Sequence, residues 1–155
     1  MFDSHTSLEK LLQYIVITLE APNLESMDVN SAATNSVILL DRDTIDPCQV
    51  IDLKKTEFTN CITCFEKKVG ESKLSAIISG AGSVAGFVAI GSMFLDVEET
   101  YPTKGRILIY ELDCRSNKLH SRHIENIGGS VQAISIMKED ASYLVVGVNN
   151  EMQLY

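Results

Sequence analysis

The stretch DVEETYPTKGRILIYEL, residues 96–112, joins two kinds of sequence that predict different structures. Its first half is acidic and contains Pro102, which is typical of a loop, whereas residues 107–112 form an apolar run that predicts a buried strand. A Thr-Lys-Gly-Arg turn lies between the two halves. An acidic loop in this position has two explanations: it caps the strand pair, or it forms a surface for a partner.

The same strand pattern recurs along the chain at intervals of about ten residues. The predicted strands cover residues 14–20, 36–41, 48–53, 60–67, 86–95, 105–113, 118–125, 131–138, 143–149 and 151–155. Only residues 1–13 show spacing that allows a short helix. Many short strands with turns between them predict an all-β sandwich, barrel or propeller.

Turn chemistry between these strands predicts antiparallel neighbours. Residues 41–44 suit a type I turn, Asn117 tolerates a left-handed backbone, and Asn149-Asn150 suits a two-residue hairpin. We divide the chain into an N-terminal segment with one strand and a polar loop (1–35) and a strand-rich region (36–155). A glycine-rich insertion is expected near 70–86.

Composition limits the classes of function. The chain has 155 residues, 45% of them hydrophobic and 22% charged, which is typical of one globular domain. Its net charge of -8 disfavours direct binding to nucleic acid phosphates, so any nucleic-acid contact is expected to be indirect, through a complex. There is no membrane-length apolar run and no signal-peptide pattern, which predicts a soluble intracellular protein with no membrane partner. The four cysteines fit reduced, buried thiols.

Two motifs suggest ligand binding, but each has a simpler explanation. The glycines of residues 80–86 resemble a phosphate-binding loop, yet a strand pattern follows them where a helix is required. Cys61 with Cys64 and His120 with His123 could form a zinc site. Residues three apart on a strand point to opposite faces, which favours structural cysteines. We therefore expect no cofactor and no metal.

Catalytic patterns are equally weak. Glu98 and Glu99 are adjacent carboxylates, but adjacent side chains diverge, and the sequence shows no nucleophile motif. A solvated acidic loop is the simpler interpretation. The chain is expected not to be an enzyme.

A composite of motifs carries a resemblance to a known family. It consists of Gly91, the Glu98-Glu99 pair, the stretch PTKGRIL (102–108) and Asn117-Lys118-Leu119 in fixed order, with strands on both sides. Residues 36–155 resemble the C-terminal propeller region of the family that contains the large subunit of the damaged-DNA-binding protein. The same family contains the largest subunit of the cleavage and polyadenylation specificity factor and the large propeller subunit of the spliceosomal SF3b complex.

This resemblance implies an incomplete, WD40-like seven-bladed β-propeller with four-stranded antiparallel blades. At about 40 to 45 residues per blade, the chain accounts for about three blades and is expected to be a fragment. The tight connection after residue 113 favours the damaged-DNA-binding subunit over the polyadenylation subunit, which usually carries a longer insert there.

The resemblance also implies site residues. The partner-binding positions carried over are Glu57, Phe58, Asn60, Glu98, Glu99 and Tyr101, and the structural turn is Pro102, Gly105 and Arg106. Asn60 and Tyr101 depart from the family's chemical type. The alternative is that Phe58 and Tyr101 pack between blades. The turn is expected to need a positive φ at Gly105.

The implied function is a protein-interaction scaffold, an adaptor of cullin ubiquitin ligases in DNA repair and protein degradation. Its partners would be a cullin scaffold and substrate receptors. The alternative is a subunit of a pre-mRNA 3′-end cleavage and polyadenylation complex or of the SF3b splicing complex, with RNA-processing subunits as partners. The implied location is the nucleus, with the cytoplasm as a second location.

Overall fold

The computed structural model describes residues 14–21, 34–68, 84–96, 98–113, 115–137 and 143–155, and every regular element among them is a strand. The strands are β1 (Tyr14–Ala21), β2 (Thr34–Asp41), β3 (Pro47–Asp52), β4 (Glu57–Lys68), β5 (Val84–Phe94), β6 (Gly105–Asp113), β7 (Lys118–Ile127), β8 (Val131–Ile136), β9 (Leu144–Val148) and β10 (Glu151–Leu154). All ten predicted strands are confirmed, with small shifts at their ends. The helix allowed at residues 1–13 lies outside the described residues.

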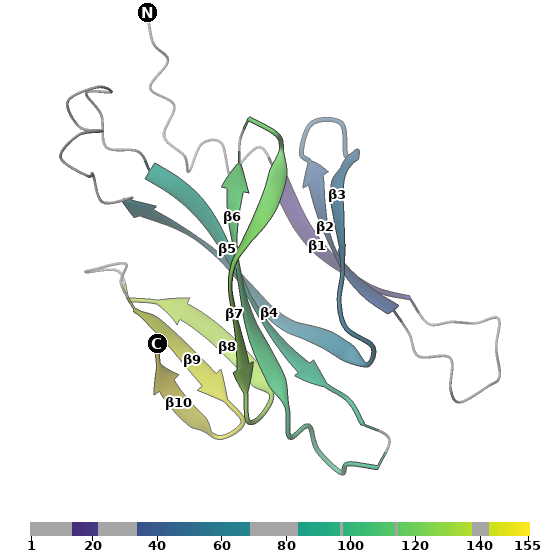
Figure 1. The fold of residues 1–155 in the computed structure, drawn as a ribbon, viewed down its shortest axis with the longest axis vertical. Helices are drawn as coiled ribbons and strands as arrows, with labels where there is room; N and C mark the ends of the chain where they lie inside the picture. The colour runs from purple at the N-terminus through teal and green to yellow at the C-terminus, as the bar shows by residue number, and fades with distance from the viewer. Residues whose placement is uncertain (1–13, 22–33, 69–83, 97, 114, 138–142) are drawn as a thin grey trace, which may run out of the picture.

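The strands form three antiparallel sheets (Figure 1). Their orders are β1-β2-β3, β4-β5-β6-β7 and β10-β9-β8, so within each sheet every strand pairs with its neighbour in sequence. β1 pairs with β2 along its whole length, which places the strand of the N-terminal segment in the first sheet. The small residues at 84–86, expected in the glycine-rich insertion, belong to β5.

The inner strands β5 and β6 of the central sheet are buried on both faces. Along β6, Leu108 and Tyr110 pack toward the first sheet with Val37 and Leu39, whereas Ile107 packs toward the third sheet with residues of β8 and β9. Because side chains alternate across a strand, a strand covered on both faces must be apolar at successive positions. This explains the continuous apolar run of residues 107–110. Three sheets stacked in this way are consecutive blades of a propeller, as expected (Figure 1).

Left-handed backbone conformations mark several turns. Asn117 has a φ of 54° and Asn149 has a φ of 51°, which confirms both predicted turns. Val148 and Glu151 are paired, so the hairpin loop has two residues. Ile45 and Thr56 also have positive φ values, which their residue types did not predict. No helix among the described residues is long and apolar enough to span a membrane.

Candidate partner-binding face

Four connections meet at one end of the stacked sheets, and we call this end the loop face. They are residues 53–56, the described part of 95–104, residues 128–130 and residues 149–150 (lower end of Figure 1). Backbone hydrogen bonds join these connections in two pairs: Leu95 N donates to the Thr56 carbonyl at 2.9 Å, and Asn149 N donates to the Ser130 carbonyl at 3.0 Å. The loop face is therefore built by all three sheets.

The acidic loop before β6 is fastened by one of its own carboxylates. Glu99 accepts hydrogen bonds from the Thr103 hydroxyl at 2.7 Å and from the Thr103 N–H at 3.2 Å. Glu98 is exposed, and its backbone N–H donates to Asp96 Oδ1 at 3.3 Å. The two carboxylates thus differ: Glu99 holds the loop in shape, whereas Glu98 faces solvent.

The two aromatic residues expected at the site lie in different environments. The Tyr101 side chain is 70% exposed, so it does not pack between blades as the alternative interpretation required. Phe58 is partly buried on β4, in register with Met93 of β5. An exposed tyrosine next to Pro102 is the most accessible aromatic feature of the described loop face.

Glu57 lies inside the protein, which differs from the partner-facing position expected from the sequence. Its side chain is 0% exposed. Oε1 accepts hydrogen bonds from Ser92 Oγ at 2.6 Å and from Arg106 Nε at 2.8 Å, and Oε2 accepts from the Lys54 N–H at 3.0 Å and from Arg106 NH2. Buried charges are found mainly where they are paired in this way, so this carboxylate supports the loop face from below.

The electrostatic balance at Glu57 favours the ionised form. Burial raises the pKa of the carboxyl, but the hydrogen bonds from Arg106, Ser92 and Lys54 and the positive charge of Arg106 outweigh burial and lower the pKa below its ordinary value. Arg106, expected in the turn, is 7% exposed and is the second residue of β6. The Glu57 carbonyl accepts a 2.6 Å hydrogen bond from Asn35 Nδ2, which joins the first sheet to the second.

Asn60 links the second and third sheets. The register of β4 shifts between Thr59 and Cys61, so Asn60 is the extra residue of a β-bulge, a feature that re-aims side chains. Its Nδ2 donates to Ser130 Oγ at 2.8 Å and to the Val131 carbonyl at 3.1 Å. The Asn60 amide nitrogen is therefore engaged within the protein.

Gly105 is required for a reason other than the one expected. Its φ lies outside the left-handed region, so the expectation of a positive φ is wrong. A Cβ atom at this position would lie 2.4 Å from the Gly129 carbonyl oxygen and 2.4 Å from the Ser92 carbonyl oxygen. The close approach of two backbone segments therefore excludes a side chain.

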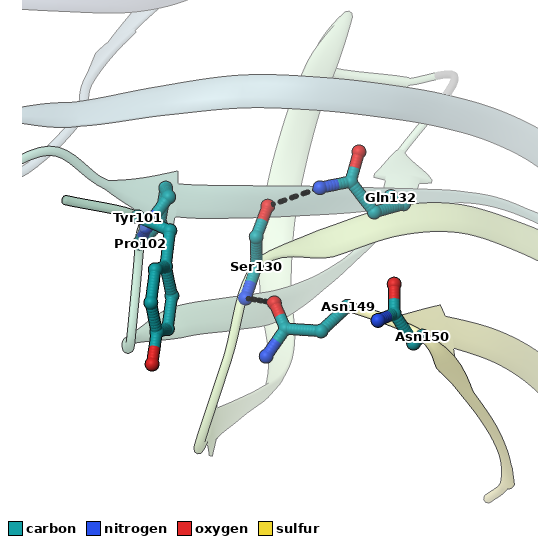
Figure 2. A pocket seen from close by; sticks show the side chains of 6 residues that line it. All are labelled: Tyr101, Pro102, Ser130, Gln132, Asn149 and Asn150. Atoms are coloured by element: carbon teal, nitrogen blue, oxygen red, sulfur yellow. Dashed lines mark hydrogen bonds between the residues drawn. The ribbon is translucent and has the colours of Figure 1, made fainter.

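The loop face contains an open hollow of about 760 Å³ (Figure 2). Its lining residues are Tyr101, Pro102, Ser130, Gln132, Asn149 and Asn150. Ser130 lies at its centre: its N–H donates to Asn149 Oδ1 at 2.9 Å, and its Oγ accepts from Gln132 Nε2 at 2.9 Å. The hollow lies between the second and third sheets, with Tyr101 and Pro102 on one side.

Residues 34–155 match the family described as the CPSF A subunit region. The chain belongs to this family. The match begins at the first residue of β2 and includes every later strand, so the family's β-propeller fold and the three stacked sheets agree. No curated protein matches the chain. The resemblance stated from the motifs is thus confirmed for the family, whose description as a subunit region supports a scaffold role with protein partners in a multiprotein complex.

The motifs set aside in the sequence are only partly covered by the described residues. Among the described residues, no group of three or more His, Cys, Asp or Glu side chains is placed to hold a metal ion. Cys61 is partly buried and Cys64 is exposed, so the latter departs from the expectation of buried thiols. Burial raises the pKa of the Cys61 thiol. Most of the glycine-rich segment 80–86 and all of Cys114 lie outside the described residues.

Sequence reasoning missed the residues that shape the hollow in the third sheet. Gln132 was assigned only to the strand of residues 131–138, Asn149 and Asn150 only to a hairpin turn, and Ser130 to no element. The available signal was weak: two adjacent asparagines in a two-residue loop satisfy turn chemistry completely, so nothing in the sequence required a further role. The pairing of Glu57 with Arg106 was also missed. Both residues lie near the start of a strand, and a charged residue that is buried there needs a partner.

Proposed function

We propose that this propeller is a non-enzymatic scaffold whose loop face binds other proteins. The observation that carries the proposal is the 70% exposed side chain of Tyr101 on a loop whose conformation is held by Glu99 and Thr103. Aromatic residues are the commonest binding anchors at protein interfaces, and nearby charges such as that of Glu98 orient the partner. A loop that is already ordered loses less conformational entropy on binding.

The buried network beneath the loop supports the same function. Arg106 and Glu57 hold the starts of β6 and β4 together, and Asn60 joins β4 to the third sheet. Binding residues on loops are positioned best when a rigid scaffold carries them. In this proposal Glu57, Phe58 and Asn60 act mainly by positioning the loop face, whereas Glu98 and Tyr101 make the contacts.

For the finer role we propose an adaptor of cullin ubiquitin ligases, acting in DNA repair and protein degradation in the nucleus. The supporting feature is the short connection between β6 and β7. Asp113 accepts hydrogen bonds from the Arg115 N–H at 2.9 Å and from Ser116 Oγ at 2.7 Å, which closes the turn. A turn closed in this way leaves no space for the longer insert that is usual in the polyadenylation subunit.

The second candidate is a subunit of a pre-mRNA 3′-end processing complex or of the SF3b splicing complex. The description of the family as the CPSF A subunit region favours it. In this role the partners are RNA-processing subunits, and nucleic acid is contacted through the complex, because a chain with a net charge of -8 repels phosphates.

Affinity purification of the full-length natural protein tests the proposal. Recovery of a cullin and propeller-binding receptors is expected, and recovery of an endonuclease or a polymerase would favour the second candidate. Tyr101→Ala should reduce recovery, whereas Tyr143→Ala, which removes a tyrosine that is 46% exposed and lies away from the loop face, should not. Purification without specific protein partners would overturn the scaffold role.

A further inference from the structure

The hollow on the loop face has an uncharged lining. Its six lining residues are two asparagines, a glutamine, a serine, a tyrosine and a proline. The segment that leads into it carries the carboxylates of Asp96, Glu98 and Glu99. Because the lining itself carries no charge, it would select a ligand by hydrogen bonding and shape.

Several polar groups of the hollow have no partner within the described residues. Ser130 Oγ accepts hydrogen bonds from Asn60 Nδ2 and Gln132 Nε2, and the Ser130 N–H donates to Asn149 Oδ1. This leaves the Gln132 Oε1 acceptor, the Asn149 Nδ2 donors and the whole side-chain amide of Asn150 without an intramolecular hydrogen bond in the described part of the chain. Figure 2 shows these side chains around Ser130. The hollow thus presents donors and acceptors at short spacing.

The floor of the hollow is also preorganised. Asn149 has a φ of 51°, and it exchanges two hydrogen bonds with Ser130, one from its backbone N–H and one to its side chain. The Asn149 side chain lies against Gly129, where a Cβ atom would be 2.4 Å from Asn149 Nδ2. Polar groups fixed before binding lose little entropy when a ligand reaches them.

We propose that the hollow binds an uncharged, extended segment of a partner polypeptide through the main chain of that segment. A side-chain amide carries one carbonyl and one NH₂ group, so it pairs with a peptide unit as an acceptor and a donor together. Tyr101 and Pro102 then pack against a side chain of the bound segment. The inference deepens the proposed function and rests on it, because it specifies which chemistry of a partner the loop face accepts.

Charge determines which ligands are disfavoured. A phosphate or carboxylate would meet no cation in the lining, and the connection that supplies Tyr101 and Pro102 also carries the carboxylates of Asp96 and Glu98. A lysine or arginine would find no carboxylate in the lining. A nucleobase also pairs with side-chain amides and stacks on tyrosine, but its strand would bring phosphates against the acidic loop. A neutral peptide can pair with the polar groups of the lining, and it brings neither an unpaired charge nor a phosphate to the hollow.

Selection from a displayed library of random 12-residue peptides tests the inference on the 155-residue chain. Selected peptides should be depleted in Asp, Glu, Lys and Arg at the central positions. N-methylation of their central amides should weaken binding at least about tenfold. Tyr101→Ala should weaken binding about tenfold or more and Asn150→Ala about threefold to tenfold. The controls Tyr143→Ala and Asn126→Ala, which lie outside the lining, should bind like the wild type.

The outcomes separate this inference from the proposed function. Failure to select any peptide, selection of charged peptides, or binding that Tyr101→Ala and Asn150→Ala leave unchanged would overturn the inference. Tighter binding of an uncapped dA8 or dT8 oligonucleotide than of the selected peptides would overturn it as well. If the full-length protein with both substitutions still recovers its partners, the scaffold stands and only the role of the hollow is lost. If the wild type recovers none, the proposed function itself fails.

Discussion

Replacing Arg106 by methionine should destabilise the fold more than any surface substitution. The change keeps an unbranched side chain of similar reach but removes the guanidinium from Glu57, which is 0% exposed. Two of the four hydrogen bonds to the carboxylate disappear, those from Arg106 Nε and NH2, and the bonds from Ser92 Oγ and the Lys54 N–H remain. The carboxylate is then left buried without a cation from the described residues.

The expected loss is about 3–5 kcal/mol of unfolding free energy, the usual cost of removing one partner of a buried ion pair. The two remaining donors place the value at the lower end of this range. Since domains of this size are stable by about 5–15 kcal/mol, the variant should unfold at a much lower urea concentration. Adding Glu57→Gln to Arg106→Met should recover part of the loss, because the buried charge is then absent.

The pH dependence provides an independent check. In the wild type the folded-state pKa of Glu57 is lowered, so its stabilisation is present above the unfolded-state pKa and is lost as the pH falls through the folded-state pKa. Without Arg106, burial raises the pKa instead. The Arg106→Met variant should therefore gain stability relative to the wild type as the pH falls from about 7 to about 4.

Urea unfolding followed by circular dichroism measures both effects. The matched control is Arg122→Met, which removes an arginine paired with Glu111 at the surface, with a side chain that is 58% exposed. It should cost about 0–1 kcal/mol. A loss below about 1 kcal/mol for Arg106→Met, or parallel pH profiles for the two proteins, would refute the reasoning that Glu57 depends on Arg106 for its burial.

Three further predictions follow from the loop face. Gly105→Ala should cost about 1–3 kcal/mol in thermal or urea unfolding, because its Cβ would lie 2.4 Å from two backbone oxygens. Gly128→Ala should be neutral, because a Cβ atom there would have no atom within 4 Å. Equal costs for the two substitutions would contradict the close-approach argument. Glu98→Ala should slow partner association and weaken the salt dependence of the association rate without changing stability. Glu99→Ala should also increase proteolysis of the loop. Identical behaviour of the two variants in stopped-flow and limited proteolysis would show that the two carboxylates do not differ in role. Asn60→Ala should cost about 1–3 kcal/mol by removing the two hydrogen bonds that Asn60 Nδ2 donates to Ser130 and Val131. An unchanged unfolding midpoint would argue against that link.

Much of the fold was predictable because its determinants are local. Ten apolar runs at regular spacing, each bounded by turn residues, predict strands, and hairpins follow from short connections such as Asn149-Asn150. The apolar run of β6 predicted a buried strand, which the structure confirms. The family match over residues 34–155 agrees with a propeller inferred from ordered motifs.

The candidate site was predictable only in part. Tyr101 and Glu98 lie on the surface, as expected for these residue types in a loop. Glu57 is buried, and Asn60 forms hydrogen bonds that join two sheets. A β-bulge turns Asn60 toward Ser130, 70 residues later, and no local pattern encodes that register shift. Neither residue type nor spacing states whether a polar side chain at a strand end faces water or a neighbouring blade.

Most strand positions, several turns and the family could be predicted, since each depends on residues close together in the chain. Only the packing of the sheets shows that Glu57 meets Arg106 across 49 residues, that Gly105 lies against the Gly129 carbonyl, and that three connections and β8 line one neutral hollow. The physical reason is that burial and pairing of polar groups depend on how sheets stack. Stacking is a property of all three sheets together, and no single segment contains it.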